Sequence, residues 1–259
     1  MSRRLLVAAV GLGLVIVVAA VMWLRADEEP PALDRGGDAL PVVLVHGYGG
    51  GPSSMTAIEE RLRADGREVI NVTLPDGGVG DILQSARVVD EAVRAARSQT
   101  VDLVGFSMGG VVIRAYVAEL GGAAHARYVI SLASPHHGTD IAGLATFADP
   151  SACTGACEQL APDSSFLEDL NDPDETPAGP AFVTVWTERD ETVTPPESAE
   201  LNGALNIKIQ EVCPDSTIGH GEMVREPAVV GLIVETLSGR LTGIPEPARC
   251  SALAELGAA

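Results

Sequence analysis

The segment Val101 to Gly110, VDLVGFSMGG, places a serine two residues after one glycine and two residues before another, directly behind an apolar run. The run VDLVG is typical of a buried β-strand, and the segment from Met108 to Leu120 is typical of a helix that ends at Gly121. A serine side chain that stands clear of the sheet at such a junction needs a very tight turn. Gly105 and Gly109 remove the collisions that this turn would otherwise produce. The pattern therefore predicts a sharp strand-to-helix connection that presents the serine hydroxyl.

The hydroxyl of Ser107 is suited to nucleophilic attack. A Gly-x-Ser-x-Gly arrangement between a strand and a helix is the nucleophile elbow, where the helix N-terminus offers N–H groups to developing negative charge. The alternative is a helix N-cap in a glycine-rich turn. A serine alcohol is a poor nucleophile at neutral pH, so the catalytic interpretation requires a histidine base and an acid that orients it.

Chain order selects the candidates for base and acid. The histidines are His46, His125, His136, His137 and His220. In this arrangement the partners occur in the order serine, acid, histidine, so only His220 is late enough to be the base; the alternative is an exposed loop histidine. We expect Asp190 to be the acid, because it follows the predicted strand 181–187 at the same edge of the sheet as Ser107. Glu191 remains the alternative acid.

The negative charge that forms on the substrate oxygen needs donors, worth about 3 to 4 kcal/mol each. One expected donor is the backbone N–H of Met108. The second usually comes from the loop after an earlier strand, which here reads VHGYGGGP, and we expect Tyr48 to supply it. His46 is expected to orient this loop by hydrogen bonding and to take no proton from Ser107.

The remaining chain alternates apolar runs with helix-like segments. Predicted strands cover 41–45, 67–74, 101–105, 126–134, 181–187 and 205–212, and predicted helices cover 54–65, 81–98, 108–120 and 224–237, the last as the final helix. Strands buried on both faces and separated by helices indicate an α/β fold with a mostly parallel central sheet and helices on both faces. Ligand chemistry in such sheets gathers at the carboxyl ends of the strands.

The N-terminus differs from the rest of the chain. Two arginines precede the uncharged apolar run Leu5 to Leu24, which is followed by Arg25 and the acidic stretch DEEPP. Its length favours an N-terminal apolar helix that serves as a membrane anchor over a cleaved signal segment, and both remain open. The expected domains are an anchor or signal over 1–26, a linker over 27–40 and a catalytic domain over 41–259. The positive-inside rule places that domain outside the cell, membrane-anchored or secreted.

Charge and cysteines limit the partners and the compartment. The net charge of −19 disfavours nucleic acid, because an acidic surface repels phosphates. Four cysteines in an exported chain suggest two disulfides, and of the three possible pairings we expect Cys153 with Cys157 and Cys213 with Cys250. Without CxxC spacing a metal site is the less favoured alternative. The acidic stretch NDPDET lacks the calcium-loop pattern and is expected at the surface.

The motifs PVVLVHGYGG, DLVGFSMGG, SLASPHHGTD, ERDETVTPP and IGHGEM, in this order, resemble those of bacterial secreted lipases and esterases of the α/β-hydrolase superfamily. The resemblance implies a triad of Ser107, Asp190 and His220, with Tyr48 and Met108 at the oxyanion positions. It also implies that His136 and His137 shape the substrate cleft. Some relatives hold zinc nearby, but further ligands are not identified in this sequence, and no cofactor is implied.

The resemblance implies hydrolysis of carboxylic esters, of small molecules or lipids, through an acyl-enzyme. The irregular insertion 135–180 departs from the family pattern, and a partial lid is one role for it. Its scarcity of amphipathic helix pattern argues against a large lid and favours short to medium acyl chains. An acyltransferase on the same triad and a non-catalytic binding module remain the alternatives.

Overall fold

The computed structural model describes residues 39–140 and 153–258. Its centre is a six-stranded sheet in the order β2-β1-β3-β4-β5-β6, and every neighbouring pair is parallel. The strands are β1 (Val42–Val45), β2 (Val69–Val72), β3 (Val101–Phe106), β4 (Ala126–Leu132), β5 (Ala181–Trp186) and β6 (Leu205–Lys208). The helices are α2 (Thr56–Ala64), α3 (Ile82–Ala95), α4 (Met108–Glu119), α6 (Ala156–Gln159), α7 (Ser165–Asn171), α8 (Ile209–Val212), α9 (Pro227–Leu237) and α10 (Cys250–Ala258).

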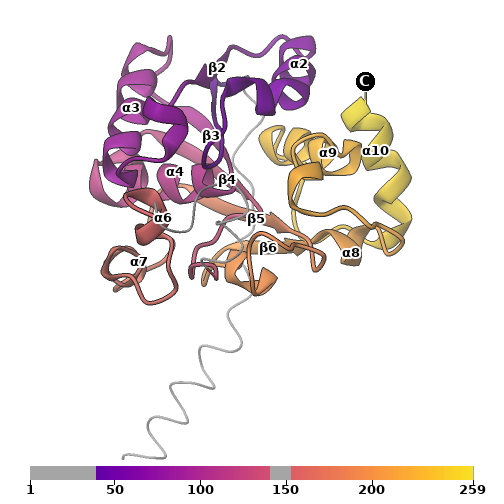
Figure 1. Cartoon of the computed structure of the whole chain (residues 1–259). Helices are drawn as coiled ribbons and strands as arrows, with labels where there is room; N and C mark the ends of the chain where they lie inside the picture. Colours follow the sequence, from indigo (N-terminus) through magenta and orange to yellow (C-terminus); the bar gives the residue numbers. More distant parts are fainter. Residues whose placement is uncertain (1–38, 141–152, 259) are drawn as a thin grey trace, which may run out of the picture. The chain divides into compact units, whose positions relative to one another are not determined.

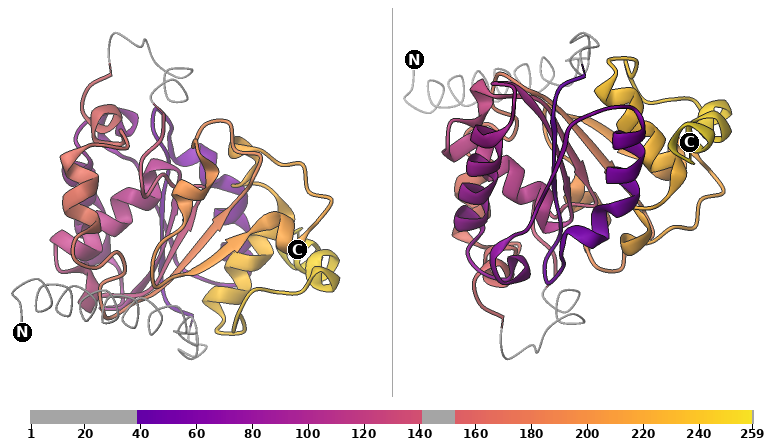
Figure 2. Two further views of the ribbon diagram at one scale, coloured as in Figure 1. Left: turned by 90° about the horizontal axis from the view of Figure 1, so that it is seen from below. Right: turned by 90° about the horizontal axis from the view of Figure 1, so that it is seen from above.

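Helices cover both faces of the sheet, as the sequence predicts. Helices α3 and α4 lie on one face, and α2, α9 and α10 lie on the other (Figures 1 and 2). Alternate side chains of β1 lie on opposite faces of the sheet. Val42 and Leu44 belong to the core under α2 and α9, whereas Val43 and Val45 belong to the core under α3 and α4. Burial on both faces explains the continuous apolar run of β1, whereas the edge strands β2 and β6 contain half-buried polar residues.

The predicted secondary structure is wrong in several places; for example, the predicted helix 81–98 ends at Ala95. The predicted strand 205–212 ends at Lys208, and its second half is the short helix α8. The predicted helix 224–237 begins only at Pro227, whose fixed φ suits the first turn of a helix. That helix is also not the last one, because α10 follows it, buries Leu253 in the core and lies against α9 (Figure 1).

The insertion 135–180 is less irregular than expected. It contains α6 and α7, and the side chain of Ser164 caps α7 by accepting a hydrogen bond from the N–H of Leu167. Residues 141–152 of the insertion lie outside the described part.

The anchor or signal expected over 1–26 also lies outside the described residues, as does the linker up to residue 38. Within 39–140 and 153–258, none of the helices has the length and apolar character needed to span a bilayer.

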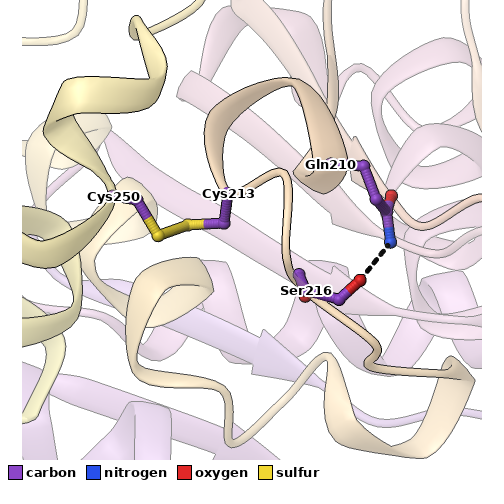
Figure 3. Close-up of a disulfide and its surroundings, with 4 residues drawn as sticks. All are labelled: Gln210, Cys213, Ser216 and Cys250. Carbon is purple, nitrogen blue, oxygen red and sulfur yellow. Dashed lines mark hydrogen bonds between the residues drawn. A yellow bond between two sulfur atoms is a disulfide. The ribbon is translucent and has the colours of Figure 1, made fainter.

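Both expected disulfides are present. Cys153 bonds to Cys157, and Cys213 bonds to Cys250, which ties the segment after α8 to the start of α10 (Figure 3). Two disulfides are compatible with an oxidising compartment outside the cytoplasm.

The two disulfides are expected to differ in their effect on stability. Cross-linking a longer loop removes more entropy from the unfolded chain, so the Cys213–Cys250 bond, with a sequence separation of 37, should contribute about 4 kcal/mol against about 2 kcal/mol for the Cys153–Cys157 bond. Urea unfolding of the two paired Cys→Ser variants measures this difference. Equal losses of unfolding free energy, or a larger loss from the shorter loop, would contradict the loop-entropy argument.

Candidate active site

Ser107 lies in the turn between β3 and α4 and has a backbone conformation that is unusual for a residue with a side chain. Its φ is 55° and its ψ is −129°, a combination that costs free energy and is found mainly at functional sites. Glycines make the turn possible by close approach. A Cβ at Gly105 would lie 2.4 Å from the carbonyl oxygen of Gly109, and a Cβ at Gly109 would lie 2.3 Å from that of Val45. From the sequence pattern, glycine is expected at positions 105 and 109 because a side chain there would collide with its neighbours.

Neighbouring strands and loops hold the turn in place. The backbone N–H of Ser107 donates to the carbonyl oxygen of Leu132 on β4, at 2.8 Å. The loop after β1 passes closely over the serine, since a Cβ at Gly47 would lie 2.9 Å from the Cβ of Ser107. The serine is 6% exposed, so only a small part of it is open to solvent.

Three side chains that the sequence selects from distant segments form one hydrogen-bonded chain. The Nε2 atom of His220 lies 3.0 Å from the Oγ of Ser107, and its Nδ1 atom lies 2.7 Å from the Oδ2 of Asp190. Because an ionised carboxylate only accepts, Nδ1 is the protonated nitrogen of the neutral ring and Nε2 accepts from the hydroxyl. This is the arrangement in which a histidine can take a proton from a serine.

The loop after β5 fixes Asp190. Its second carboxylate oxygen, Oδ1, accepts from the backbone N–H groups of Thr192 and Val193, both at 2.8 Å. Asp190 is 6% exposed, whereas the side chain of Glu191 is exposed to solvent. The structure thus brings Asp190, the expected acid, to the histidine and leaves the alternative acid outside this chain of hydrogen bonds.

His220 begins the short 3-10 helix η6 (His220–Glu222). The Oε2 of Glu222 accepts from the N–H of Gly219 at 3.0 Å, which caps this turn. The ring of Phe106, the residue before the serine, packs against the imidazole with the ring centroids 4.9 Å apart. The aromatic contact and the cap restrict the orientation of the imidazole.

The loop expected to supply an oxyanion donor begins at His46, which is fully buried. Its Nδ1 lies 2.9 Å from the carbonyl oxygen of Gly47, and its Nε2 accepts from the N–H of Leu74 at 3.2 Å. Burial lowers the pKa of His46, although the hydrogen bond to Gly47 opposes this. A neutral ring that holds two backbone segments together matches the expected orienting role better than proton transfer, which would require contact with Ser107.

Tyr48 follows in this loop, and Met108 is the first residue of α4. Within the described part of the chain, neither backbone N–H group makes a hydrogen bond. The oxyanion role expected for these two groups stays a prediction.

His136 and His137 do not join this hydrogen-bonded chain within the described residues. His136 is fully buried, and its Nε2 lies 2.9 Å from the Oγ of Ser131. Burial, with the nearby charge of Arg114, lowers the pKa of His136 well below its usual value and keeps the ring neutral. His137 points outward, with its Nε2 3.1 Å from the Oε1 of Glu175. In residues 39–140 and 153–258 no group of three or more His, Cys, Asp or Glu side chains could hold a metal ion.

The pair of His137 and Glu175 should make stability depend on pH. The hydrogen bond to Glu175 raises the pKa of His137, so its contribution is full below the unfolded value of 6.5 and is lost as pH rises through the folded pKa. Burial tends to raise the pKa of Glu175, but hydrogen bonds to His137 and the N–H of Asn202 lower it overall. Its contribution is therefore present above 4.5 and is lost as pH falls through the folded pKa.

We expect Glu175→Gln to destabilise the protein more at about pH 5.5 than at about pH 8, where the histidine is neutral. Urea midpoints of the wild type and the variant at both pH values measure this difference. A loss that is equal at both pH values, or larger at the higher one, would show that the charged pair does not stabilise the fold.

Several contacts at the site could not be inferred from the sequence. They include the aromatic contact of Phe106, the cap from Glu222 and the hydrogen bonds of Thr187 at the end of β5. For Phe106 and Glu222, the sequence signal is their position: Phe106 directly precedes Ser107, and Glu222 lies two positions after His220.

Comparison with known proteins identifies related folds. The sequence profile of the palmitoyl protein thioesterase family matches residues 41–162. A search of curated proteins found no match. Among solved structures, Aspergillus fumigatus lipase B superposes with a TM-score of 0.71 at 20% identity, over 85% of this chain and 60% of that one.

Two bacterial structures align over most of their length. Mature Bacillus licheniformis lipase BlEst2 has a TM-score of 0.62 at 17% identity, over 81% of this chain and 96% of that one. The Exiguobacterium antarcticum esterase has a TM-score of 0.53 at 18% identity, over 78% and 93%. This chain thus spans the bacterial enzymes almost completely but only 60% of the fungal lipase. With its parallel sheet and strand-to-helix serine turn, the described part of the chain has the α/β-hydrolase fold.

Proposed function

We propose that this protein is a carboxylic ester hydrolase that works through an acyl-enzyme on Ser107. The observation that carries the proposal is the hydrogen-bonded chain from the Ser107 hydroxyl through His220 to Asp190, with distances of 3.0 and 2.7 Å. The Ser107 hydroxyl follows the carboxyl end of β3, and ligand chemistry in parallel sheets takes place at that end of the strands.

In the acylation half-reaction, the Oγ of Ser107 attacks the ester carbonyl while Nε2 of His220 takes its proton. Asp190 stabilises the imidazolium that results. The backbone N–H groups of Tyr48 and Met108 stabilise the negative oxygen of the tetrahedral intermediate. The C–O bond then breaks, and His220 returns the proton to the leaving alcohol.

In the deacylation half-reaction, water replaces the serine hydroxyl. His220 takes a proton from water, the hydroxide attacks the acyl carbonyl, and the proton returns to Ser107 as the acid leaves. An alcohol in place of water would give acyl transfer, so adding candidate acceptors and measuring transfer products distinguishes the two reactions.

Thioester hydrolysis is the second candidate. The palmitoyl protein thioesterase profile covers the segment that carries Tyr48, Ser107 and Met108. The same nucleophile and oxyanion donors serve both reactions, and a thiol is a better leaving group than an alcohol because its pKa is lower. Thioesters therefore depend less on protonation of the leaving group by His220.

Paired substrates separate these candidates. The purified full chain, in a detergent without ester bonds, is assayed with p-nitrophenyl acetate, butyrate, octanoate and palmitate and with the corresponding acyl thioesters. We expect the highest kcat/KM for short to medium acyl esters. A higher kcat/KM for the thioester than for the ester at every acyl length would favour the second candidate, and no turnover of any substrate would refute both.

We also propose that the catalytic domain works outside the cytoplasm, either anchored by residues 1–26 or released after their cleavage. The two disulfides support an oxidising compartment.

A further inference from the structure

The two loops that carry Asp190 and His220 leave different elements of the fold. Asp190 follows β5, and His220 follows α8 and the loop 213–219. The 2.7 Å hydrogen bond between the two side chains requires that these loops keep a fixed distance from each other. A contact between the loops, behind the reacting side chains, could maintain that distance.

Thr187 provides this contact. It is fully buried directly after β5, and its Oγ1 donates to the carbonyl oxygen of Ile218 in the histidine loop at 2.8 Å. The same oxygen accepts from the N–H of Arg189, the residue before Asp190, at 3.2 Å. One hydroxyl thus bonds to the backbone within two residues of the histidine and within one residue of the acid.

Gln210 of α8 completes the contact. Its Nε2 donates to the Oγ1 of Thr187 at 2.9 Å and also lies 3.5 Å from the carbonyl oxygen of Ser216, while its Oε1 accepts from the N–H of Glu188 at 3.2 Å. Figure 3 shows Gln210 reaching toward Ser216, near the Cys213–Cys250 disulfide that holds the start of the same loop. With these bonds, the Thr187 hydroxyl uses its one donor and both of its acceptor sites.

We infer that Thr187 is a positioning residue, which acts with Gln210 to hold the loops of Asp190 and His220 at the separation that the proposed hydrolysis requires. The inference rests on the proposed function for its effect on rate, but the geometric claim can be measured without catalysis. The hydroxyl makes no contact with Ser107 within the described residues, so its effect must act through the Asp190–His220 pair.

The test compares Thr187→Val, which keeps the shape but removes the hydroxyl, with Thr187→Ser, which keeps the hydroxyl. Thr184→Val is the matched control, because Thr184 lies on β5, is equally buried and donates one hydrogen bond, to Asn206, without joining the two loops. Displacing a catalytic group by about 1 Å costs on the order of 100-fold in rate. We therefore expect Thr187→Val to lower kcat by about 10- to 100-fold with KM unchanged.

Thr187→Ser and Thr184→Val should stay within about threefold of the wild-type kcat. If Thr187→Val retained the wild-type kcat, if Thr187→Ser lost as much as Thr187→Val, or if Thr184→Val lost as much, the inference would be overturned. Should Thr187→Val fail to fold, Gln210→Met at its half-buried position removes the second part of the contact, the hydrogen bonds of Gln210 to Thr187, Glu188 and Ser216. It should then lower kcat by about 3- to 10-fold, and an unchanged kcat would overturn the inference.

A spectroscopic measurement separates this inference from the proposed function. The proton on Nδ1 of His220, shared with Asp190, is expected to give a low-field proton NMR signal in the wild type. Thr187→Val should shift or broaden this signal while Thr184→Val leaves it unchanged, whether or not the protein hydrolyses an ester. An unaltered signal in Thr187→Val would refute the positioning role. If Thr187→Val alters the signal but the wild type hydrolyses no ester, only the proposed function is refuted.

Discussion

Ser107→Ala is expected to reduce kcat for p-nitrophenyl butyrate by about 10⁴- to 10⁶-fold. The variant removes the oxygen that lies 3.0 Å from His220 Nε2, so no covalent acyl-enzyme can form. Residual activity would come from the oxyanion donors and from binding. Steady-state kinetics measures the loss, and thermal unfolding checks that the fold is intact.

The matched control for this variant is Ser85→Ala. Ser85 is a buried serine on α3 and lies outside the proposed machinery. It should keep the wild-type kcat. If Ser107→Ala keeps its activity while folded, Ser107 is not the nucleophile.

Asp190→Asn is expected to lower kcat by about 10⁴-fold while the fold is preserved. The amide oxygen of asparagine can still accept from the N–H groups of Thr192 and Val193, so the loop keeps its anchors. The amide nitrogen then faces Nδ1 of His220 and donates to it. This forces the ring proton to Nε2, which can no longer accept from Ser107.

Glu191→Gln is the control, because Glu191 is the neighbouring acid and its side chain is exposed. It should have nearly the wild-type kcat. A large loss in Glu191→Gln together with near-normal activity in Asp190→Asn would reverse the assignment of the acid.

The sequence is sufficient to predict the strands and the turn that position Ser107, because the inner strands of a parallel sheet are rich in apolar residues. The run Val42–Val45 is apolar, Val101–Phe106 is apolar except for Asp102, and the glycines around Ser107 indicate the turn between strand and helix. Chain order then reduces five histidines to His220.

The spacing of apolar residues does not predict the type of secondary structure correctly where an element is short. In LNIKIQEV, the buried residues Ile209 and Val212 are three positions apart, a spacing typical of a helical turn, but the preceding alternation favours a strand. The chain leaves the edge strand β6 at Lys208, and only the tertiary structure determines this point. The short helix α10 depends similarly on contacts with α9 and on the bond from Cys250 to Cys213.

The choice between Asp190 and Glu191 also could not be made from composition. It depends on the backbone of the loop after β5, which turns Asp190 inward and Glu191 outward. The role inferred for Thr187 has no sequence signal, because a threonine at the end of a strand is common. Its significance comes from carbonyl and N–H groups of segments up to 31 residues away.

Labelling the full chain with a fluorophosphonate and locating the adduct by peptide mass spectrometry is the most direct test of the proposed nucleophile. Such probes form a bond only with an activated serine, one whose proton a neighbouring base can take. We predict one adduct per chain, on the peptide that contains Ser107, and its loss in His220→Ala. An unlabelled wild type, or an adduct on a different residue, would contradict the central claim that His220 activates Ser107.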